Sequence, residues 1–391
     1  MMSNTNESAV LKAPILTKTF LITLIVVLIG VALIGYRYVS GIGVVSNLSD
    51  GYPWGIWLGY DVAVGTAFAC GGYILAITVY IMNNFKYHPL IRSAVLASMF
   101  GYALAGLSVM VDIGRYWNSY NFFVPGRWQP NSVMFEVALC VMAYTVILII
   151  EFLPAVFEGL ADKGHAWAKS AYKSLDKVLI FIIALGVLLP TMHQSSLGSM
   201  LIISGYKLHP LWQTMFLPML FLGNAILMGF AIVGFEVTLA TVGFKRPFEK
   251  ELVSLSKVIP FIAVGWVVIR FISITTSGAW GEAFTPSWLT LVFWLEIILV
   301  LIPAFIIQFS SWSGSMRGIF VSCFMLMFGG GMYRLSVYIT AFDPGSGYNT
   351  YFPSVSELFI TLSMIAIEIL GYITLVKIFP VLANPAAHKK H

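Results

Sequence analysis

Ten ionisable side chains lie within or at the ends of long apolar segments of this sequence. They are Asp61, Asp112, Glu136, Glu151, His193, Glu236, Arg270, Glu296, Arg334 and Glu368. At the centre of a bilayer a charged side chain costs about 2.5–3.5 kcal/mol on insertion scales, so such residues are normally paired or functional. Carboxyl and imidazole groups that are held within reach of a substrate are suited to proton transfer. If the apolar segments cross a membrane, these residues are the first candidates for chemistry.

Five polar groups gather toward one end of four successive segments. Counted from the predicted segment ends at about 1.5 Å per residue, they are Asp61, Asp112, Arg115, Glu136 and His193. Segments joined by short connections are normally neighbours in space, so we expect these residues to form a polar pocket. Two simpler interpretations stand beside this one. Asp112 and Arg115 are three residues apart and form a local ion pair, or His193 is only hydrogen-bonded at a helix end.

Two further carboxyls, Glu151 and Glu236, lie toward the other end of their segments. Glu136 and Glu151 are 15 residues apart, which is roughly 22 Å along a helix, and they lie on similar faces of it. Tyr102 falls in the middle of its segment. We expect proton transfer through a series of groups: Glu236, Glu151, Tyr102, Glu136 and His193. The structural alternative is that each carboxyl is protonated and hydrogen-bonded, or is paired with one of the two arginines inside spans.

The composition places these residues in a membrane protein. Of 391 residues, 59% are hydrophobic and 10% are charged, whereas soluble domains carry about 25% charged residues. Apolar runs of about 20 residues or more recur, and the short alternating segments of a barrel are absent. We therefore expect an all-α, polytopic transmembrane protein with ten helical spans. The predicted spans are 19–38, 54–83, 89–112, 131–156, 177–194, 213–243, 255–277, 285–309, 316–342 and 355–379.

The distribution of positive charge predicts the orientation of these spans. With the N-terminus inside, the inner segments hold 16 of the 22 lysines and arginines, and the outer segments hold 4. The positive-inside rule then places both termini in the cytoplasm. We expect a cytoplasmic segment 1–18 without a cleaved signal peptide, a membrane domain 19–380 and a cytoplasmic tail 381–391. Weakly similar stretches within the membrane domain suggest two four-helix bundles, at about 54–194 and 213–342.

Cysteine and histidine usage argues against a metal cofactor on this chain. Cys70, Cys140 and Cys323 lie inside apolar runs and form no CxxC pair, which excludes a cysteine-ligated iron–sulfur cluster built by this chain alone. A b-type haem with two histidine ligands needs two imidazoles that face each other within spans. Of six histidines, only His193 lies at a span end with membrane around it. We therefore expect no haem, no iron–sulfur cluster and no metal site on this chain.

A lipid-soluble quinone is the redox partner that fits these constraints. Quinones bind in apolar pockets that carry a few convergent polar groups. Reduction of a quinone takes two electrons and two protons, and the protons require acid–base groups within hydrogen-bond reach of the carbonyl oxygens. His193 and the carboxyls beside it are suited to that role.

Several long stretches resemble one known family. They are "GYPWGIWLGYDVAVGTAFACGG", "KYHPLIRSAVLASMFGY", "DIGRYWN", "NSVMFE", "LPTMHQSSLGS", "GYKLHPLWQ" and "AFDPGSGY" with "YFP" after it. They resemble the HybB-type integral membrane subunit of hydrogenase-2-type nickel–iron hydrogenases, a branch of the NrfD-like (polysulfide reductase) family. The resemblance runs from about Gly41 to Pro380 and so covers nearly all the spans.

The resemblance implies a haem-free subunit of a bacterial inner-membrane complex that exchanges electrons with menaquinone or ubiquinone. Its implied partners are a ferredoxin-like iron–sulfur subunit and the small and large hydrogenase subunits on the periplasmic side. Those partners carry the iron–sulfur clusters and the NiFe centre that oxidises hydrogen. The family's proton-active and quinone-site positions match Tyr102 in "FGYAL", Glu136 in "SVMFE", His193 in "PTMHQSS" and Glu236 in "GFEVT". The "D-x-G-R" of the family matches Asp112 and Arg115.

Three other functions remain open at this point. Buried charges are also typical of secondary transporters, whose sites lie near the membrane midplane, whereas the polar residues here gather toward one end. A membrane anchor without a quinone site is a further alternative. The family also includes membrane subunits of other NrfD-like oxidoreductases, so the partner is not fixed as a hydrogenase.

Overall fold

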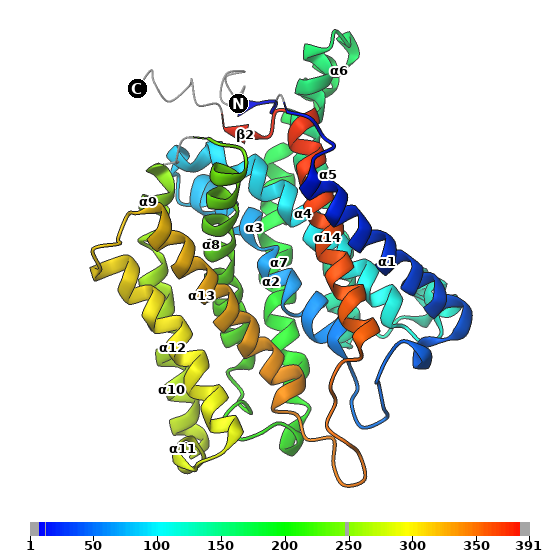
Figure 1. The fold of residues 1–391 in the computed structure, drawn as a ribbon, viewed down its shortest axis with the longest axis vertical. Coiled ribbons are helices and arrows are strands. Elements are labelled where there is room, and N and C mark those ends of the chain that lie inside the picture. The colour runs from blue at the N-terminus through cyan, green and yellow to red at the C-terminus, as the bar shows by residue number, and fades with distance from the viewer. Residues whose placement is uncertain (1–7, 12, 247–249, 384–391) are drawn as a thin grey trace.

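Ten long apolar helices form the body of the protein (Figure 1). The computed structural model describes residues 8–11, 13–246 and 250–383. Within these residues, ten helices are long and apolar enough to cross a membrane, which confirms the prediction of an all-α polytopic membrane protein. The spans are Lys18–Ser40, Trp57–Ile81, Phe85–Asp112, Val133–Asp162, Leu179–Ile202, Leu217–Gly243, Glu251–Ser277, Trp288–Phe309, Met316–Thr340 and Val355–Ile378.

The spans are made of α-helices with a few π-helical and 3₁₀-helical pieces. The α-helices in or beside the spans are α1 (Lys18–Ser40), α2 (Gly65–Phe68), α3 (Gly71–Ala76), α4 (Ile91–Asp112), α5 (Val133–Asp162), α7 (Leu179–Ile202), α8 (Leu217–Gly243), α9 (Lys250–Ser256), α10 (Ile259–Ser277), α12 (Trp288–Phe309), α13 (Met316–Leu335) and α14 (Val355–Ile378). The π-helices are η2 (Trp57–Val62), η3 (Ile77–Ile81) and η8 (Ser336–Thr340). The connections contain α6 (Ala166–Asp176), α11 (Trp280–Phe284) and the 3₁₀ helices η1 (Ile42–Val44), η4 (Phe85–Leu90), η5 (Tyr116–Phe123), η6 (Pro125–Arg127) and η7 (Gly205–Lys207).

Both described ends of the chain lie at the same end of the helices. Strand β1 (Ser8–Ala9) pairs antiparallel with β2 (Leu382–Ala383), and α6 projects from this end (Figure 1). We call this end the terminal face, and the other end, with η5, η6, η7 and α11, the opposite face. An even number of spans requires this arrangement. It agrees with the predicted pass count.

The helices pack in a continuous series. Helix α5 packs on α4 and α7, α8 packs on α7 and α13, and α12 packs on α10 and α13. Helix α1 packs on α14 at one edge, where Gly30 lets the backbone approach Ser363 closely. Small residues permit such close contacts between membrane helices. The division into two four-helix bundles stays a prediction.

The second span is irregular and is the most buried of the ten among the described residues. It passes through η2, α2, α3 and η3, so several backbone carbonyls lose their regular helical partners. Arg334 supplies donors at this break: its guanidinium donates to the carbonyl oxygens of Ala63 (2.7 Å) and Phe221 (2.6 Å) and to Asn224 Oδ1 (2.6 Å). A buried arginine here serves the backbone, in keeping with the need to satisfy every polar group inside a bilayer.

One predicted helix end is wrong and bears on the site. The fifth span is predicted to end at residue 194, but α7 continues to Ile202, so His193 lies inside the helix. The serine hydroxyls had suggested that the helix ends there, but they donate to carbonyls of the helix itself. Ser195 Oγ donates to the Thr191 carbonyl (3.1 Å), and Ser199 Oγ donates to the Ser195 carbonyl (3.2 Å). Serine hydroxyls that bond four residues back can continue a helix in this way.

Candidate functional site

His193 and Tyr102 form the centre of a polar cluster between α7 and α4. The Tyr102 hydroxyl lies 2.8 Å from His193 Nε2, and both side chains are fully buried. The neighbouring Gln194 donates from Nε2 to Thr66 Oγ1 (3.0 Å) and lies 3.4 Å from the Tyr102 hydroxyl. Cys70 Sγ lies 3.6 Å from the same hydroxyl. The irregular second span thus brings Thr66 and Cys70 against the polar face of α7.

The hydrogen bonds of His193 define its neutral tautomer. Its Nδ1 lies 2.8 Å from the Leu189 carbonyl oxygen, which can only accept. Nδ1 therefore carries the proton in the neutral imidazole, and Nε2 accepts from the Tyr102 hydroxyl. The Tyr144 ring packs edge-on against the Tyr102 ring. The pair can move a proton between phenol and imidazole without solvent.

Glu136 joins this cluster through the next turn of α7. Ser196, three residues after His193, donates to Glu136 Oε1 at 2.8 Å. Glu136 lies in the first turn of α5, which begins after the N-cap Ser132 near the opposite face. Glu136 of α5 therefore lies against the turn of α7 that follows His193, and His193 in turn contacts the Tyr102 hydroxyl.

Asp112 and Arg115 do not form an ion pair among the described residues. Arg115 is exposed, and Asp112 Oδ1 is buried without a hydrogen-bond partner. Arg37 of α1 lies beside Asp112 and donates to the carbonyl oxygens of Val111 (2.7 Å) and Ile113 (2.5 Å). The local ion pair considered from the sequence is therefore not formed, because the helix end is held by an arginine from another span.

A large cavity lies on the other side of α4, between α1, α2, α4, α8, α13 and α14. Its volume is about 650 Å³ and its walls are mostly apolar. Three carboxyls line it: Asp61 near the opposite face, Glu368 on α14 and Glu236 on α8. Asp61 Oδ2 accepts a hydrogen bond from Thr361 Oγ1 at 3.3 Å. Within the described part of the chain, Glu236 and Glu368 make no hydrogen bond, so their carboxyls are available to a ligand in the cavity.

Glu151 lies apart from this cavity, on α5. Its Oε1 is buried without a hydrogen-bond partner and lies against Gly186 of α7. Arg270, one of the two arginines considered as a partner, instead pairs with Glu296 at 3.3 Å, and Trp212 donates to the same carboxylate. Neither Glu136 nor Glu151 is therefore held by a buried arginine among the described residues.

The predicted residues fall into two groups separated by α4. Glu136, His193 and Tyr102 share the polar cluster, whereas Asp61 and Glu236 line the large cavity. Gly101 lines the cavity while the next residue, Tyr102, faces His193, so α4 presents one group on each side. Asp112, Arg115 and Glu151 lie outside both groups.

Sequence reasoning missed three polar residues of these groups, namely Gln194, Thr66 and Thr361. It counted Glu368 among the ionisable residues of the spans but gave it no role in the site. Gln194 had a usable signal, since it is a strongly polar residue deep in an apolar run. The two threonines had none, because threonine is common in membrane helices and ordinarily bonds to its own backbone.

Among the proteins that this chain is similar to are two subunits of redox complexes. The chain is 43% identical over 372 residues, or 94% of its length and 93% of the relative's, to the Escherichia coli "Probable Ni/Fe-hydrogenase 2 b-type cytochrome subunit". It is also 30% identical over 171 residues to the "Menaquinone reductase, integral membrane subunit" of Nitratidesulfovibrio vulgaris, which covers 42% of this chain and 39% of that protein.

The first of these names overturns the expectation that the chain carries no haem, since a b-type cytochrome is a haem protein. The expectation was wrong because it considered only ligation of haem by two facing histidines, whereas haem iron accepts other ligands as well. The described residues do not offer a free imidazole pair inside the spans. Both ring nitrogens of His193 are hydrogen-bonded, and the other described histidines are only half-buried or exposed.

A family model matches most of the chain. Residues 44–342 match the family described as "Polysulphide reductase, NrfD". The matched region runs from the connection after α1 to the end of η8 and includes the whole polar cluster. With ten spans and a full-length relative in a hydrogenase, this chain belongs to the NrfD (polysulphide reductase) family of integral membrane subunits.

Proposed function

We propose that this chain is the quinone-reactive membrane subunit of a hydrogen:quinone oxidoreductase. In this proposal a partner iron–sulfur subunit delivers electrons at the opposite face, and a quinone accepts them within the membrane. The large cavity is the observation that carries the proposal. Support also comes from the relatives, of which one is a hydrogenase 2 subunit and one a menaquinone reductase subunit.

The cavity has the size and chemistry of a quinone site. Small-molecule pockets are about 300–1,000 Å³ with mainly apolar walls and a few polar groups, and this cavity measures about 650 Å³. Asp61, with Tyr60 and Ser108 near it, supplies polar groups at the end nearest the opposite face. Met364 and Leu104 provide apolar wall at that end. We place the quinone ring near Asp61 and its isoprenoid chain along the rest of the cavity.

Reduction of the bound quinone by two electrons requires two protons. Asp61 is within the cavity and is the acid nearest to the proposed ring position. On the far side of α4, the Tyr102 hydroxyl contacts His193, and Glu136 accepts from Ser196 on the next turn of α7. We propose that Glu136, His193 and Tyr102 exchange protons. We propose that Glu236 and Glu151 bring protons from the terminal face, so that quinone reduction translocates charge across the membrane.

The opposite face offers a surface for a protein partner. Large aromatic side chains stand exposed on its connections, among them Trp117 and Phe123 of η5, Tyr206 of η7 and Phe352. Aromatic residues are enriched in the cores of protein interfaces. We propose that a ferredoxin-like iron–sulfur subunit docks here, with the small and large hydrogenase subunits beyond it, and that this face is periplasmic.

The terminal face is cytoplasmic in this proposal, in the inner membrane of a bacterium. Helix α6 and its flanks carry Lys163, Lys169, Lys173 and Lys177 at this end. Positive charge in short connections marks the cytoplasmic side of membrane proteins.

Substitution of Asp61 tests the quinone site. In the purified complex, Asp61→Asn should lower hydrogen-dependent quinone reduction by about 10²-fold, the usual effect of losing an acid–base group. Hydrogen-dependent reduction of a soluble redox dye should be unchanged, because the dye takes electrons from the partner subunits. Asp50→Asn, at an exposed aspartate on the same face, is the matched control. Wild-type quinone reduction by the Asp61 variant would contradict the proposed site.

A further inference from the structure

We propose that Tyr372 is the residue through which protons enter the large cavity from the terminal face. This proposal rests on the proposed quinone reaction and adds a route to it that does not use Glu151. Tyr372 lies on α14, four residues after Glu368, and was not among the residues expected to act.

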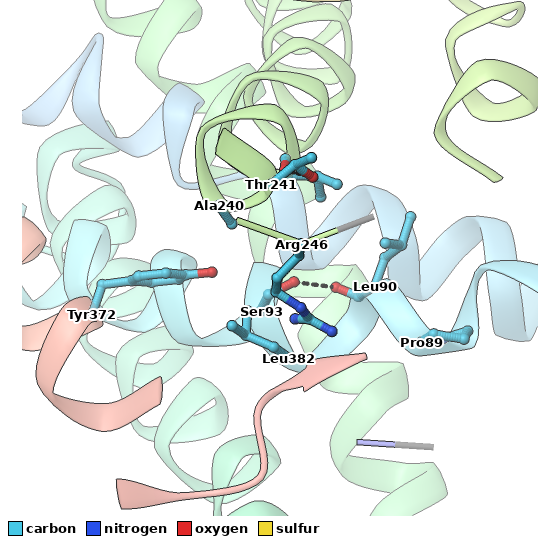
Figure 2. A pocket seen from close by; sticks show the side chains of 9 residues that line it. Pro89, Leu90, Ser93, Ala240, Thr241, Arg246, Tyr372 and Leu382 are labelled. Atoms are coloured by element: carbon cyan, nitrogen blue, oxygen red, sulfur yellow. Dashed lines mark hydrogen bonds between the residues drawn. The ribbon is translucent and has the colours of Figure 1, made fainter. Parts of the chain in front are cut away.

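A second, small cavity of about 20 Å³ lies at the terminal face (Figure 2). Ser93, Arg246, Leu382 and Tyr372 are among the residues that line it. Figure 2 shows the Tyr372 hydroxyl pointing toward Ser93 and Arg246, and Ser93 Oγ donates to the Leu90 carbonyl at 2.9 Å. A volume of this size accommodates about one water molecule where polar groups surround it. The small cavity is therefore suited to pass a proton between the terminal face and Tyr372.

Tyr372 also lines the large cavity, so its ring forms part of the wall between the two. Ala240 of α8 is the other residue near Glu236 that lines both cavities. A tyrosine hydroxyl both donates and accepts hydrogen bonds. It can therefore accept a proton from one side and release its own to the other without a net change in charge.

The carboxyls beyond Tyr372 continue the route along one face of α14 and α8. Glu368 precedes Tyr372 by four residues, and Glu236 precedes Ala240 by four, so each pair shares a helix face at a spacing of about 6 Å. Thr361, which holds Asp61, lies seven residues before Glu368, about two helical turns away. Tyr372, Glu368 and Asp61 are thus arranged in order from the terminal face toward the proposed quinone ring.

The reaction balances along this route. Each quinone takes two electrons from the iron–sulfur partner and two protons onto its two carbonyl oxygens, forming two O–H bonds. Asp61 gives a proton to the quinone, and Glu368 or Glu236 then reprotonates Asp61. Tyr372 in turn reprotonates that glutamate from the terminal side. Every O–H bond broken along the route is re-formed by the next donor, and the two protons come from water at the terminal face.

Removal of the Tyr372 hydroxyl tests the route. The complex, reconstituted in vesicles with the terminal face inward and a pH-sensitive dye enclosed, is given hydrogen and a short-chain quinone. Tyr372→Phe, which keeps the ring, should lower lumenal proton uptake and quinone reduction together by about 10²-fold, the scale of a lost proton-transfer group. Tyr372→His should restore a large part of both rates, because imidazole also relays protons.

A matched control lies on the same helix. Thr374→Val removes a hydroxyl that only donates to the Leu370 carbonyl (2.7 Å) and does not line either cavity, so it should leave both rates unchanged. Equal rates in Tyr372→Phe, Thr374→Val and the wild type would overturn the Tyr372 route. A wild-type complex that reduces a soluble redox dye with hydrogen but reduces no quinone would instead overturn the proposed function itself.

Discussion

The Tyr102 hydroxyl lies 2.8 Å from Nε2 of His193, and the other nitrogen of that imidazole is held by the Leu189 carbonyl of its own helix. This pair joins α4, one wall of the large cavity, to the turn of α7 that holds Glu136 through Ser196. In the proposed reaction, we expect protons that pass between the cavity side and the Glu136 side to cross at the Tyr102 phenol.

We expect Tyr102→Phe to lower hydrogen-dependent quinone reduction by about 10²-fold, because Nε2 of His193 loses its proton donor. The ring remains, so packing changes little. The rate is measured in the purified complex with a soluble dye as the internal reference. Tyr144→Phe is the control, since the Tyr144 ring contacts Tyr102 but its hydroxyl makes no hydrogen bond among the described residues. Similar rates for the two variants would show that Tyr102 serves only packing.

The spans and the even pass count follow from hydrophobicity and charge, which act over about 20 residues and tolerate local irregularity. The continuation of α7 beyond His193 could not be predicted in this way, because the pattern of Pro190, His193 and the serines is also typical of a loop. Whether such a polar segment ends a helix or continues it depends on whether neighbouring helices supply partners for its other polar side chains. Here the Gln194 amide donates to Thr66 and Tyr102, and both of these residues come from other spans.

The grouping of the carboxyls was predictable only in part. Depth along the spans correctly placed Glu136 and His193 near each other, because depth follows from counting residues. It could not assign Asp61 and Asp112 to different surroundings, since that depends on which way each helix face turns. The partner of Asp61 on α14, Thr361, is 300 positions away in sequence.

The contact of α1 with α14 predicts a sharp difference between two glycines of one helix. A Cβ at Gly30 would lie 2.0 Å from Ser363 Oγ, whereas a Cβ at Gly35 would meet nothing within 4 Å. Gly30→Ala should therefore destabilise the protein by about 1–3 kcal/mol through overpacking, measured as the midpoint of thermal unfolding in detergent. Gly35→Ala gains the same helix propensity without the clash. Adding Ser363→Gly to Gly30→Ala should recover the lost stability, and its failure to do so would locate the strain elsewhere.

His209, in the connection between α7 and α8, is expected to make the stability of the folded protein sensitive to acid. Burial lowers the pKa of His209, and the nearby carboxylate of Glu282 (3.9 Å) opposes this effect only in part. Its Nδ1 also accepts a hydrogen bond from the Leu211 amide at 3.3 Å, which a proton on Nδ1 would break. The folded protein therefore favours the neutral imidazole.

Because the pKa of His209 is lower in the folded state than its ordinary value of about 6.5, the unfolded chain binds a proton more readily below that pH. Stability should be unaffected by this residue well above pH 6.5 and should fall as the pH drops below it. The effect is modest, since the side chain is 22% exposed. His209→Gln should flatten the dependence of the thermal midpoint between pH 7 and pH 5, while His165→Gln, at an exposed histidine on the terminal face, serves as the control. An unchanged slope in His209→Gln would mean that another group governs the acid sensitivity.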